Sequence, residues 1–476
     1  MPYDTGGRST HLHGSQCGRG RTRGPGRWAA GALRAGVLLS ALLAGSSLRA
    51  AAQGQVLTGA PPAVTLQQAV DEALRASPGL LAAQQEADAA RKQIGVRRGQ
   101  LYGELDVVAS AQHYSYAQLL EPMQGPLTPA ASAAAPFAQD QVHLGVVYTY
   151  PLYVAGRILN EVRIAELGAE RARELLTGAR SDVVYNVTAL FVQAQALQAQ
   201  AAAVQQEIDE LEVTRKDLDL AVKLGKRPEV DLLKVLDRIS EAQAARDGLT
   251  ASRTRIVAAL MALMGRRPNQ PVTLASLPDR LPDLTTAETG LDKGAANRST
   301  VRAAKLAADQ TERQVEVARA LMEPNVALQA TYLRHADTSY LDQSKEYWYV
   351  GLQVGFPLFD AGSRRAGVSA AQREAAAAKH RLETARLQSL SELQAALAAW
   401  QAARQQMAAA NAQYDSAHEV ARIEQLRYDT GAGDIEDLLR ARTREVGAQT
   451  AQITARAQII MSGAQINHVT ESEVAR

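Results

Sequence analysis

Apolar and polar residues alternate along four segments of the chain, and this period of two predicts β-strands with two different faces. The first pair of segments covers residues 105–112 and 142–150, and the second pair covers residues 326–334 and 347–356. Each predicted strand has about ten residues, the length that crosses a bilayer when a strand is tilted. The intervening residues 121–139 are rich in Pro and Ala and predict a long loop.

Two long segments without proline follow the second and fourth strands and predict long helices. Residues 157–224 predict one helix of about 68 residues, which at ~1.5 Å per residue has a length of roughly 100 Å. Residues 364–428 predict the other. Each is expected to turn at a glycine, Gly225 or Gly431, and to run back as a second helix. The return helices are predicted to end near residue 264 and to begin near residue 434.

Shorter helices are predicted before each strand pair. Residues 64–98 repeat apolar positions at helical spacing, but Ser77-Pro78 interrupts them, so two pieces are expected. The corresponding helix of the second half starts near Ser299 and ends before Pro324. In the last long helix, a seven-residue register predicts packing on a neighbouring helix. The residues in this register are Leu393, Trp400, Met407, Tyr414 and Ala421.

The same plan occurs twice in the chain. Pro-Leu-Tyr-Val-Ala-Gly at residues 151–156 recurs as Pro-Leu-Phe-Asp-Ala-Gly at residues 357–362, an offset of 206 residues. The turn glycines Gly225 and Gly431 have the same offset. Two landmarks with one offset indicate a duplication.

The N-terminal segment has the pattern of a secretory signal peptide. Arginines precede an apolar run at residues 35–44, and small residues at 50–52 predict cleavage near Ala52. The run is shorter than the ~18 residues that span a bilayer. We therefore expect four parts: residues 1–52 as signal peptide, 53–265 as first repeat, 266–298 as a Pro-containing linker, and 299–476 as second repeat.

Composition and charge narrow the class of protein. The chain has 476 residues, of which 46% are hydrophobic but only 4% aromatic, and its abundant alanine favours close-packed helices over a bulky core. Without residues 1–52, 45 basic and 49 acidic residues remain, so no basic surplus is available for nucleic acid. The single cysteine, Cys17, lies in the predicted signal peptide.

The sequence contains none of the motifs that would indicate an enzyme. Its eight histidines form no HExxH or other close metal-ligand pairing in the mature chain, and there is no P-loop or G-x-S-x-G motif. Residues 431–433 are only G-x-G. We expect no catalytic residue, no metal and no cofactor.

Four strands of bilayer length cannot close a barrel. Because a sheet with open edges is excluded from lipid, a barrel would have to be assembled from several chains. Two chains would give eight strands and a filled interior, whereas three would give twelve strands and a water-sized pore. The alternative is that the strands form the edge of a soluble sandwich.

The order of the motifs resembles the outer membrane efflux protein family, the TolC family, over essentially the whole mature chain. The shared plan is a split helix, a hairpin, Pro-Leu-(Phe/Tyr)-x-x-Gly, a long helix, a Gly turn with Asp-Leu-Leu, and a return helix. One departure is Gly103, which stands where the second repeat has Pro324.

The resemblance implies a mainly α fold with a small β contribution. Two long coiled-coil helical hairpins and four strands per chain would form a trimeric α-barrel tunnel and a 12-stranded outer-membrane β-barrel. The expected function is an outer-membrane exit duct of a tripartite efflux or type I secretion system. The expected partners are two further copies of the chain, outer-membrane lipid, a periplasmic adaptor protein and an inner-membrane pump of RND or ABC type. The alternative is that the chain is itself a periplasmic adaptor or scaffold with long helical hairpins.

The resemblance also implies functional residues at the two helix turns. Asp437 matches an aspartate that narrows the pore in family members, and Tyr428 matches a tyrosine that helps to hold some members closed. Asp231 is at the equivalent position in the first repeat, so a trimer would carry six carboxylates. Two residues depart from the pattern, because Arg440 replaces a second constriction aspartate and Gly433 replaces a locking arginine.

Two further interpretations concern the same turns. Tunnels of this family are docked end-on by an adaptor, which the resemblance assigns to the residues of the turn tips: Gly225, Lys226, Arg227, Gly431 and Gly433. The alternative for Asp231 and Asp437 is that they only cap their helices, where a carboxylate favours the helix dipole by ~0.3 to 1 kcal/mol.

Overall fold

The computed structural model describes residues 63–119, 128, 137–276, 290–337 and 340–471. The predicted signal peptide, residues 1–52, lies outside these ranges, as do most of the predicted loop 121–139 and residues 277–289 of the predicted linker. Among the described residues, none of the helices is both long and apolar enough to cross a membrane.

Helices occur in both halves of the chain, and all the predicted ones are among them. In the first half they are α1 (Leu66–Ala76), α2 (Pro78–Gly99), the short 3-10 helix η1 (Gln100–Tyr102), α4 (Arg157–Lys223) and α5 (Glu229–Leu263). In the second half they are α6 (Leu291–Ala296), α7 (Ser299–Ala320), α8 (Ser363–Asp429) and α9 (Ile435–Thr470). The two long helices have 67 residues each, which confirms the predicted length.

Local sequence explains where the first helix is split. Thr65 caps α1 through a capping box, in which its hydroxyl accepts from the Gln68 backbone N–H and the Gln68 side chain accepts from the Thr65 N–H. Ser77 has an extended backbone, as expected for the residue before a proline, and Pro78 occupies the first turn of α2. The predicted break at Ser77-Pro78 is therefore confirmed.

Helix α6 was missed by the sequence analysis. It lies in residues 266–298, which were predicted to be linker. Its Leu291 and Ala295 are buried against Leu393 of α8 and Ile466 of α9. This six-residue helix therefore depends on tertiary packing rather than on a strong local signal.

The strands form one antiparallel sheet in the order β1-β2-β3-β4. Their bounds are β1 (Glu104–Leu119), β2 (Phe137–Tyr153), β3 (Asn325–Asp337) and β4 (Tyr340–Gly355). They have 13 to 17 residues, so the predicted length of about ten residues was wrong. The strand pairing continues past the apolar alternation into polar residues such as His113 and Asp140, and residues 137–139 belong to β2 rather than to the predicted loop.

One face of the sheet is apolar and exposed. The register aligns Val107 with Val146, Val146 with Tyr332, and Tyr332 with Trp348. Trp348 leaves 73% of its surface exposed in the single chain. An exposed apolar face of this extent is unusual in a soluble protein, and it marks a surface that is covered by other apolar groups.

The Pro-Leu-(Phe/Tyr) motifs mark the bends from strand to helix. In each, an alanine and a glycine adopt the left-handed backbone conformation before the long helix starts: Ala155, Gly156, Ala361 and Gly362. In the second repeat the carboxylate of Asp360 also accepts hydrogen bonds from the backbone N–H groups of Arg364 and Gly362, both at 3.0 Å. These bonds, that from Arg364 above all, lower the pKa of Asp360.

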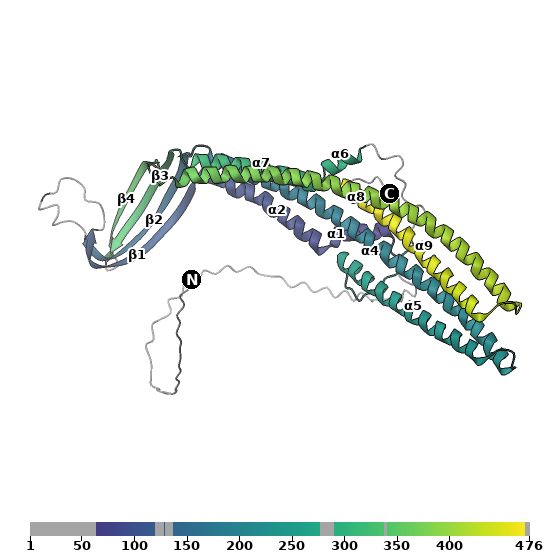
Figure 1. Ribbon diagram of the computed structural model, residues 1–476. Coiled ribbons are helices and arrows are strands. Elements are labelled where there is room, and N and C mark those ends of the chain that lie inside the picture. Colours follow the sequence, from purple (N-terminus) through teal and green to yellow (C-terminus); the bar gives the residue numbers. More distant parts are fainter. Residues whose placement is uncertain (1–62, 120–127, 129–136, 277–289, 338–339, 472–476) are drawn as a thin grey trace, which may run out of the picture. The chain divides into compact units, whose positions relative to one another are not determined.

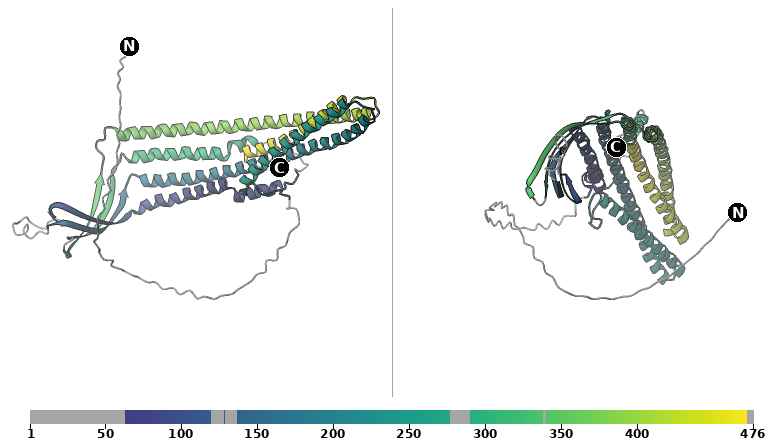
Figure 2. Two further views of the ribbon diagram at one scale, coloured as in Figure 1. Left: turned by 90° about the horizontal axis from the view of Figure 1, so that it is seen from below. Right: turned by 90° about the vertical axis from the view of Figure 1, so that its left-hand side faces the viewer.

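Shorter helices pack along both long helices, α4 and α8. Near the strands, α2, α4, α7 and α8 lie side by side in this order (Figure 2). Towards the helix turns, α5 packs on α4, and α9 packs between α4 and α8. The sheet adjoins the N-terminal ends of α4 and α8, whereas the turns lie at their C-terminal ends (Figure 1).

The packing between helices combines alanines with a few large apolar side chains. In the predicted seven-residue register of α8, Leu393, Trp400 and Ala421 are buried, and Met407 and Tyr414 are half-buried. This confirms the predicted packing role of the register. A second core, where α1 meets α4 and α5, is built around Ala69, Ala73, Val187, Phe191 and Leu260.

Candidate functional site

The two helix turns have the same hydrogen-bonded geometry. At the end of α4, Gly225 has φ +68° and donates to the Val222 carbonyl, while Lys226 donates to Ala221. At the end of α8, Gly431 has φ +77° and donates to Tyr428, while Ala432 donates to Arg427. Both are Schellman motifs, in which glycine is favoured because the left-handed conformation strains other residues. The predicted turns are thus confirmed, with identical caps.

The turns of the two repeats touch each other. The Arg227 guanidinium lies 5.0 Å from the centre of the Tyr428 ring, and Lys234 Nζ lies 3.4 Å from Glu436 Oε2. An apolar cluster joins the hairpins beneath these contacts. Its buried residues are Leu211, Leu218, Val235, Ile239, Ile435 and Leu438. Burial raises the pKa of the half-buried Tyr428, which therefore stays a neutral phenol at physiological pH.

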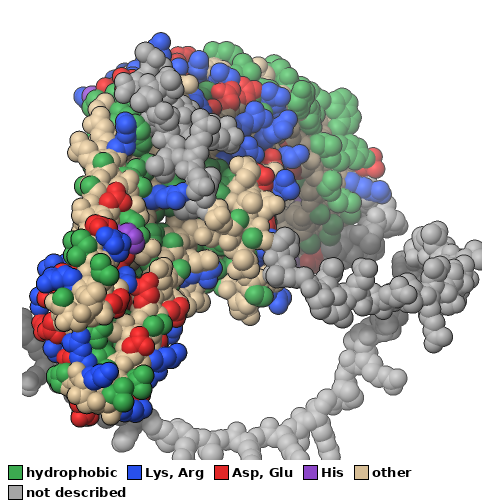
Figure 3. All heavy atoms as spheres, turned by 90° about the vertical axis from the view of Figure 1, so that its right-hand side faces the viewer, with side chains coloured by type: hydrophobic (Ala, Val, Ile, Leu, Met, Phe, Trp, Pro, Cys, Tyr) green, Lys and Arg blue, Asp and Glu red, His purple; other side chains and the backbone are tan. Residues whose placement is uncertain are grey.

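The surface around the turns carries many charged side chains of both signs. Lys and Arg side chains are interspersed with Asp and Glu side chains over the ends of the hairpins (Figure 3). Several are paired along one helix, as in Lys223–Asp219 at 2.6 Å and Arg427–Glu424 at 2.9 Å. Such exposed pairs contribute little to stability, typically ~0 to 1 kcal/mol each.

Asp231 and Asp437 differ in exposure, although the duplication places them at equivalent positions. Both lie in the first turn of a helix, α5 and α9. Asp231 is only 6% exposed, whereas the Asp437 side chain is 54% exposed. Arg440 lies 3.5 Å from Asp437 and 2.8 Å from Glu436. Of the two aspartates, only Asp437 is available at the surface, beside the equally exposed Arg440 and Glu436.

Gly433 is tightly enclosed by the end of α8. Its N–H donates to the Arg427 carbonyl at 2.9 Å. A Cβ at this position would lie 3.1 Å from both Arg427 Cβ and the Tyr428 backbone nitrogen. A larger side chain, including the arginine that the family pattern places here, would require this turn to shift by a few tenths of an ångström.

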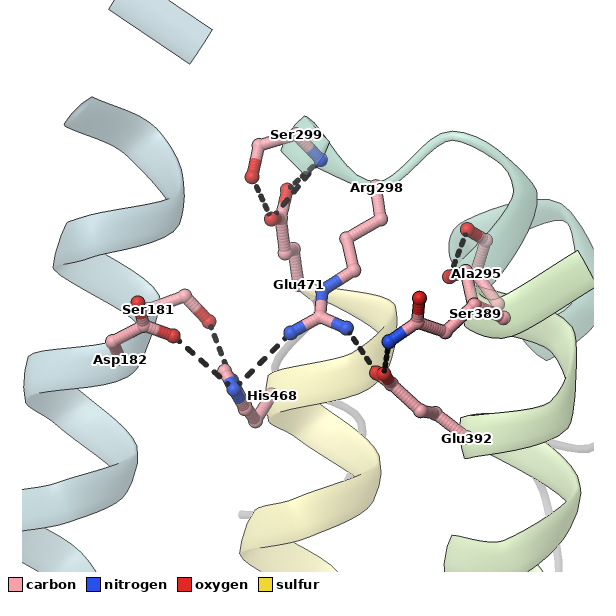
Figure 4. A network of polar contacts seen from close by, with 10 residues as sticks. Ser181, Asp182, Ala295, Arg298, Ser299, Ser389, Glu392, His468 and Glu471 are labelled. Atoms are coloured by element: carbon pink, nitrogen blue, oxygen red, sulfur yellow. Dashed lines mark hydrogen bonds and ion pairs between the residues drawn. The ribbon is translucent and has the colours of Figure 1, made fainter. Parts of the chain in front are cut away.

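A polar network in the middle of the helices was not found from the sequence. Arg298, just before α7, donates to Glu392 of α8 at 2.5 Å and lies 3.2 Å from His468 Nε2 of α9 (Figure 4). Glu471 accepts from the Ser299 backbone N–H at 3.0 and 3.1 Å and also from its hydroxyl. The residues come from separate helices without a shared motif, so spacing in the sequence gives no signal.

The network surrounds His468. Ser181 and Asp182 of α4 approach it at 3.4 and 3.3 Å, so contacts from α4 and from Arg298 converge on one imidazole (Figure 4). Burial lowers the pKa of His468, and the nearby Arg298 cation lowers it further, against the opposing effect of Asp182. The neutral imidazole is thus the form that this site favours.

A buried ion pair links α4 and α5. Arg238 donates to Glu207 Oε1 from Nη2 at 2.7 Å and from Nε at 3.0 Å. The Glu207 side chain is 3% exposed. Its burial raises the pKa of the carboxyl, while the hydrogen bonds from Arg238 oppose this shift. The pair holds the first hairpin together above the turn.

No resident cofactor is suggested by the described residues. Within the described ranges, no group of three or more His, Cys, Asp or Glu side chains is arranged to hold a metal ion. The expectation that the protein works without metal or cofactor stays a prediction.

Comparisons with known proteins agree with this architecture. A curated relative, Protein CyaE of Bordetella pertussis, is 24% identical over 324 residues, which cover 66% of this chain and 68% of that protein. The nickel-cobalt-cadmium resistance protein NccC of Alcaligenes xylosoxydans xylosoxydans is 27% identical over 245 residues, covering 50% of this chain and 52% of the relative.

Solved structures show the same fold. The outer-membrane channel OprN has a TM-score of 0.74 at 21% identity, covering 86% of this chain and 90% of that chain. The open state of the MtrE outer membrane channel of Neisseria gonorrhoeae has a TM-score of 0.70 at 22% identity, covering 86% of this chain and 90% of that chain. At these identities the likeness concerns the fold.

The family itself is identified by the match to its model. The model described as outer membrane efflux protein matches residues 69–266 and 291–470, more than three quarters of the chain. This match decides against the soluble-sandwich and periplasmic-adaptor alternatives, because the family is one of outer membrane efflux proteins. The chain belongs to the outer membrane efflux protein family and is an outer-membrane exit duct of a tripartite efflux or type I secretion system, with a large periplasmic part.

Proposed function

We propose that the duct is a homotrimer in which three four-stranded sheets close a 12-stranded barrel in the outer membrane. The observation that carries this proposal is the strand order. Within the described residues, β1 and β4 are the edges of the sheet and pair with one strand each. Open edges are excluded from lipid, and three copies give a pore wide enough for water.

The exposed apolar face would contact lipid in this assembly. Val107, Val350 and Leu352 lie on it, and each leaves at least 60% of its surface exposed in the single chain. The helices would form a periplasmic tunnel, with the four helix ends of each chain at its far end. There the tips, including Lys226 and Arg227, would dock a periplasmic adaptor that connects the duct to an inner-membrane pump.

Asp437 and Arg440 would set the charge at the narrow end of the tunnel. In a trimer, three exposed Asp437 carboxylates would form a ring that attracts cations, and each Arg440 would weaken that attraction. The buried Asp231 is left out of this ring. Tyr428, covered by Arg227, would instead hold neighbouring turns together in the closed state.

The trimer is tested by cross-linking the sheet edges. Cys17 lies in the predicted signal peptide, so introduced cysteines would be the only thiols of the mature chain. Val107→Cys in β1 is combined in turn with Trp348→Cys, Val350→Cys and Leu352→Cys in β4, and the outer-membrane protein is oxidised. We expect one combination to give covalently closed trimers, and Val107→Cys alone to give none.

The mass of the purified protein provides the second readout. Native mass spectrometry in detergent should give three copies of the mature chain. A stable, membrane-inserted monomer or dimer, together with failure of every cysteine combination to link chains, would rule out the trimeric duct.

A further inference from the structure

Two histidines face each other across the middle of the sheet. His143 of β2 is paired in register with His335 of β3. Side chains along a strand alternate between the two faces of the sheet. Leu144 and Tyr332 lie on the apolar, exposed face, an odd number of residues from His143 and His335, so both histidines lie on the opposite face. The two imidazoles therefore share the opposite, more polar face with Thr331.

The rings converge through one nitrogen each. The two Nδ1 atoms are 2.6 Å apart, and the ring planes are nearly perpendicular, at 89°, with centroids 4.2 Å apart. His335 is 9% exposed, and the Tyr347 ring lies 5.0 Å from it, whereas His143 is half-buried. At this distance one Nδ1 donates its proton to the lone pair of the other.

We propose that His143 and His335 together bind a divalent transition-metal ion through their two Nδ1 atoms. Imidazole nitrogen is a preferred ligand of Zn²⁺, Cu²⁺ and Ni²⁺. On binding, the shared proton moves to Nε2 of the donating ring, so both rings act as neutral ligands and no net proton is released. This differs from the expectation, drawn from sequence spacing, that the chain holds no metal.

The geometry requires only a small adjustment. Metal–nitrogen bonds of about 2.0 to 2.1 Å at a tetrahedral angle place the two nitrogens roughly 3.3 Å apart. A rotation of the half-buried His143 side chain supplies the difference. Because no third His, Cys, Asp or Glu within the described ranges completes the set, water would fill the other positions, and the ion would exchange readily rather than be held as a structural metal.

The site lies within one chain, so it goes beyond the proposed trimer and can be tested apart from it. The duct is purified in detergent with a tag that contains no histidine, stripped with a chelator and titrated with Cu²⁺. Electron paramagnetic resonance of the bound copper then reports the number of imidazole nitrogens. We expect one copper per chain with two imidazole nitrogens, displaced by excess Zn²⁺.

Single substitutions identify the ligands. In His143→Asn and in His335→Asn the two-nitrogen signal should be lost, whereas His380→Asn, at an exposed position on α8, should leave it unchanged. A wild-type measurement covers the case in which a variant fails to fold: Zn²⁺ should protect His143 and His335 of the intact protein from modification by diethylpyrocarbonate, read by mass spectrometry. Unchanged copper spectra in both variants, or equal modification with and without Zn²⁺, would overturn the proposal.

Discussion

Arg227 of the first repeat covers the ring of Tyr428 in the second, with 5.0 Å between the guanidinium carbon and the ring centre. The two residues are brought together by the apolar cluster between the hairpins, in which Leu218 and Ile435 are fully buried. Because the cluster fixes the helices, the contact at the tips controls mainly how the turns themselves are held. The contact therefore joins the tips of the two repeats within one chain.

Removal of this contact should loosen the tips. A partly buried cation–π contact contributes about 0.5 to 2 kcal/mol, enough to shift a closed tip towards an open one without unfolding it. We expect Arg227→Ala to raise the single-channel conductance in planar bilayers. Arg404→Ala is the matched control, since Arg404 lies 4.8 Å from the Trp400 ring within a single helix, α8. Equal conductance in the two variants and the wild type would exclude a gating role for Arg227.

The exposed carboxylate at the tip should govern ion selectivity. We expect Asp437→Ala to change conductance and reduce cation selectivity with folding intact, and Arg440→Asp to strengthen block by divalent or trivalent cations. The reason is that a ring of acids focuses cations, whereas the arginine 3.5 Å away offsets it. Reversal potentials in asymmetric salt measure the first effect, and titration of the current with Mg²⁺ or a trivalent cation measures the second.

The buried aspartate provides the contrast. Asp231 is only 6% exposed. Asp231→Asn removes its charge, which should alter thermal stability but leave cation selectivity unchanged. If Asp437→Ala instead lowers the melting temperature and leaves selectivity unchanged, both acids are helix caps and the constriction lies elsewhere.

The duplication and the turns could be predicted because their signals are local. Pro78 and Pro324 end elements by removing a backbone donor, and Gly225 and Gly431 supply the left-handed residue that ends a helix. The sequence also pointed to Tyr428 and Asp437. It could not show that Asp231 is buried while Asp437 is exposed, because the contacts between the hairpins decide this and they have no sequence period.

The parts that were missed all depend on long-range contacts. Helix α6 is held by Leu393 and Ile466 from other helices. The network around His468 joins residues that are up to 287 positions apart in sequence. The strands were predicted too short because polar residues such as His113 and Asp140 stay in the ladder, where hydrogen bonds rather than apolar side chains extend the strand.

The turn glycine should be the only residue that fits its position. In Gly431→Ala the added Cβ meets no atom within 4 Å, but the residue must keep φ near +77°, which costs about 1 to 2 kcal/mol for an L-residue. We expect a lower melting temperature. Gly248→Ala is the control, because Gly248 lies inside α5 with equally open space and a helical backbone, where alanine should stabilise by about 0.4 to 1 kcal/mol. Destabilisation of the same size in both variants would contradict the strained turn.

The Glu207–Arg238 pair should be sensitive to loss of the cation. Arg238→Ala leaves a carboxylate buried at 3% exposure without its partner, which is expected to cost about 3 to 5 kcal/mol. Glu207→Gln should cost less, because Arg238 keeps its exposed partner Glu241 at 3.1 Å. Thermal unfolding of the detergent-solubilised duct measures both. The reverse order of stabilities would mean that Arg238 acts through the packing of its side chain rather than through its charge.

The last prediction concerns the pH dependence that follows from His468. Its pKa is lowered in the folded chain by burial and then by Arg298, while an unfolded histidine has a pKa of about 6.5. The unfolded state therefore binds more protons than the folded state once the pH falls below about 6.5, and folding loses free energy in that range. The stabilising contribution is complete above this pH, since both states are then neutral at this position.

The melting temperature should accordingly fall as the pH is lowered from 7.5 to 5.5, and His468→Gln should make this decrease smaller. His380→Gln, at an exposed position on the same chain, should keep the wild-type slope. If the His468 variant shows the same slope as the wild type, the carboxylates Asp182, Glu392 and Glu471 around the ring compensate its charge, and the network is not sensitive to pH.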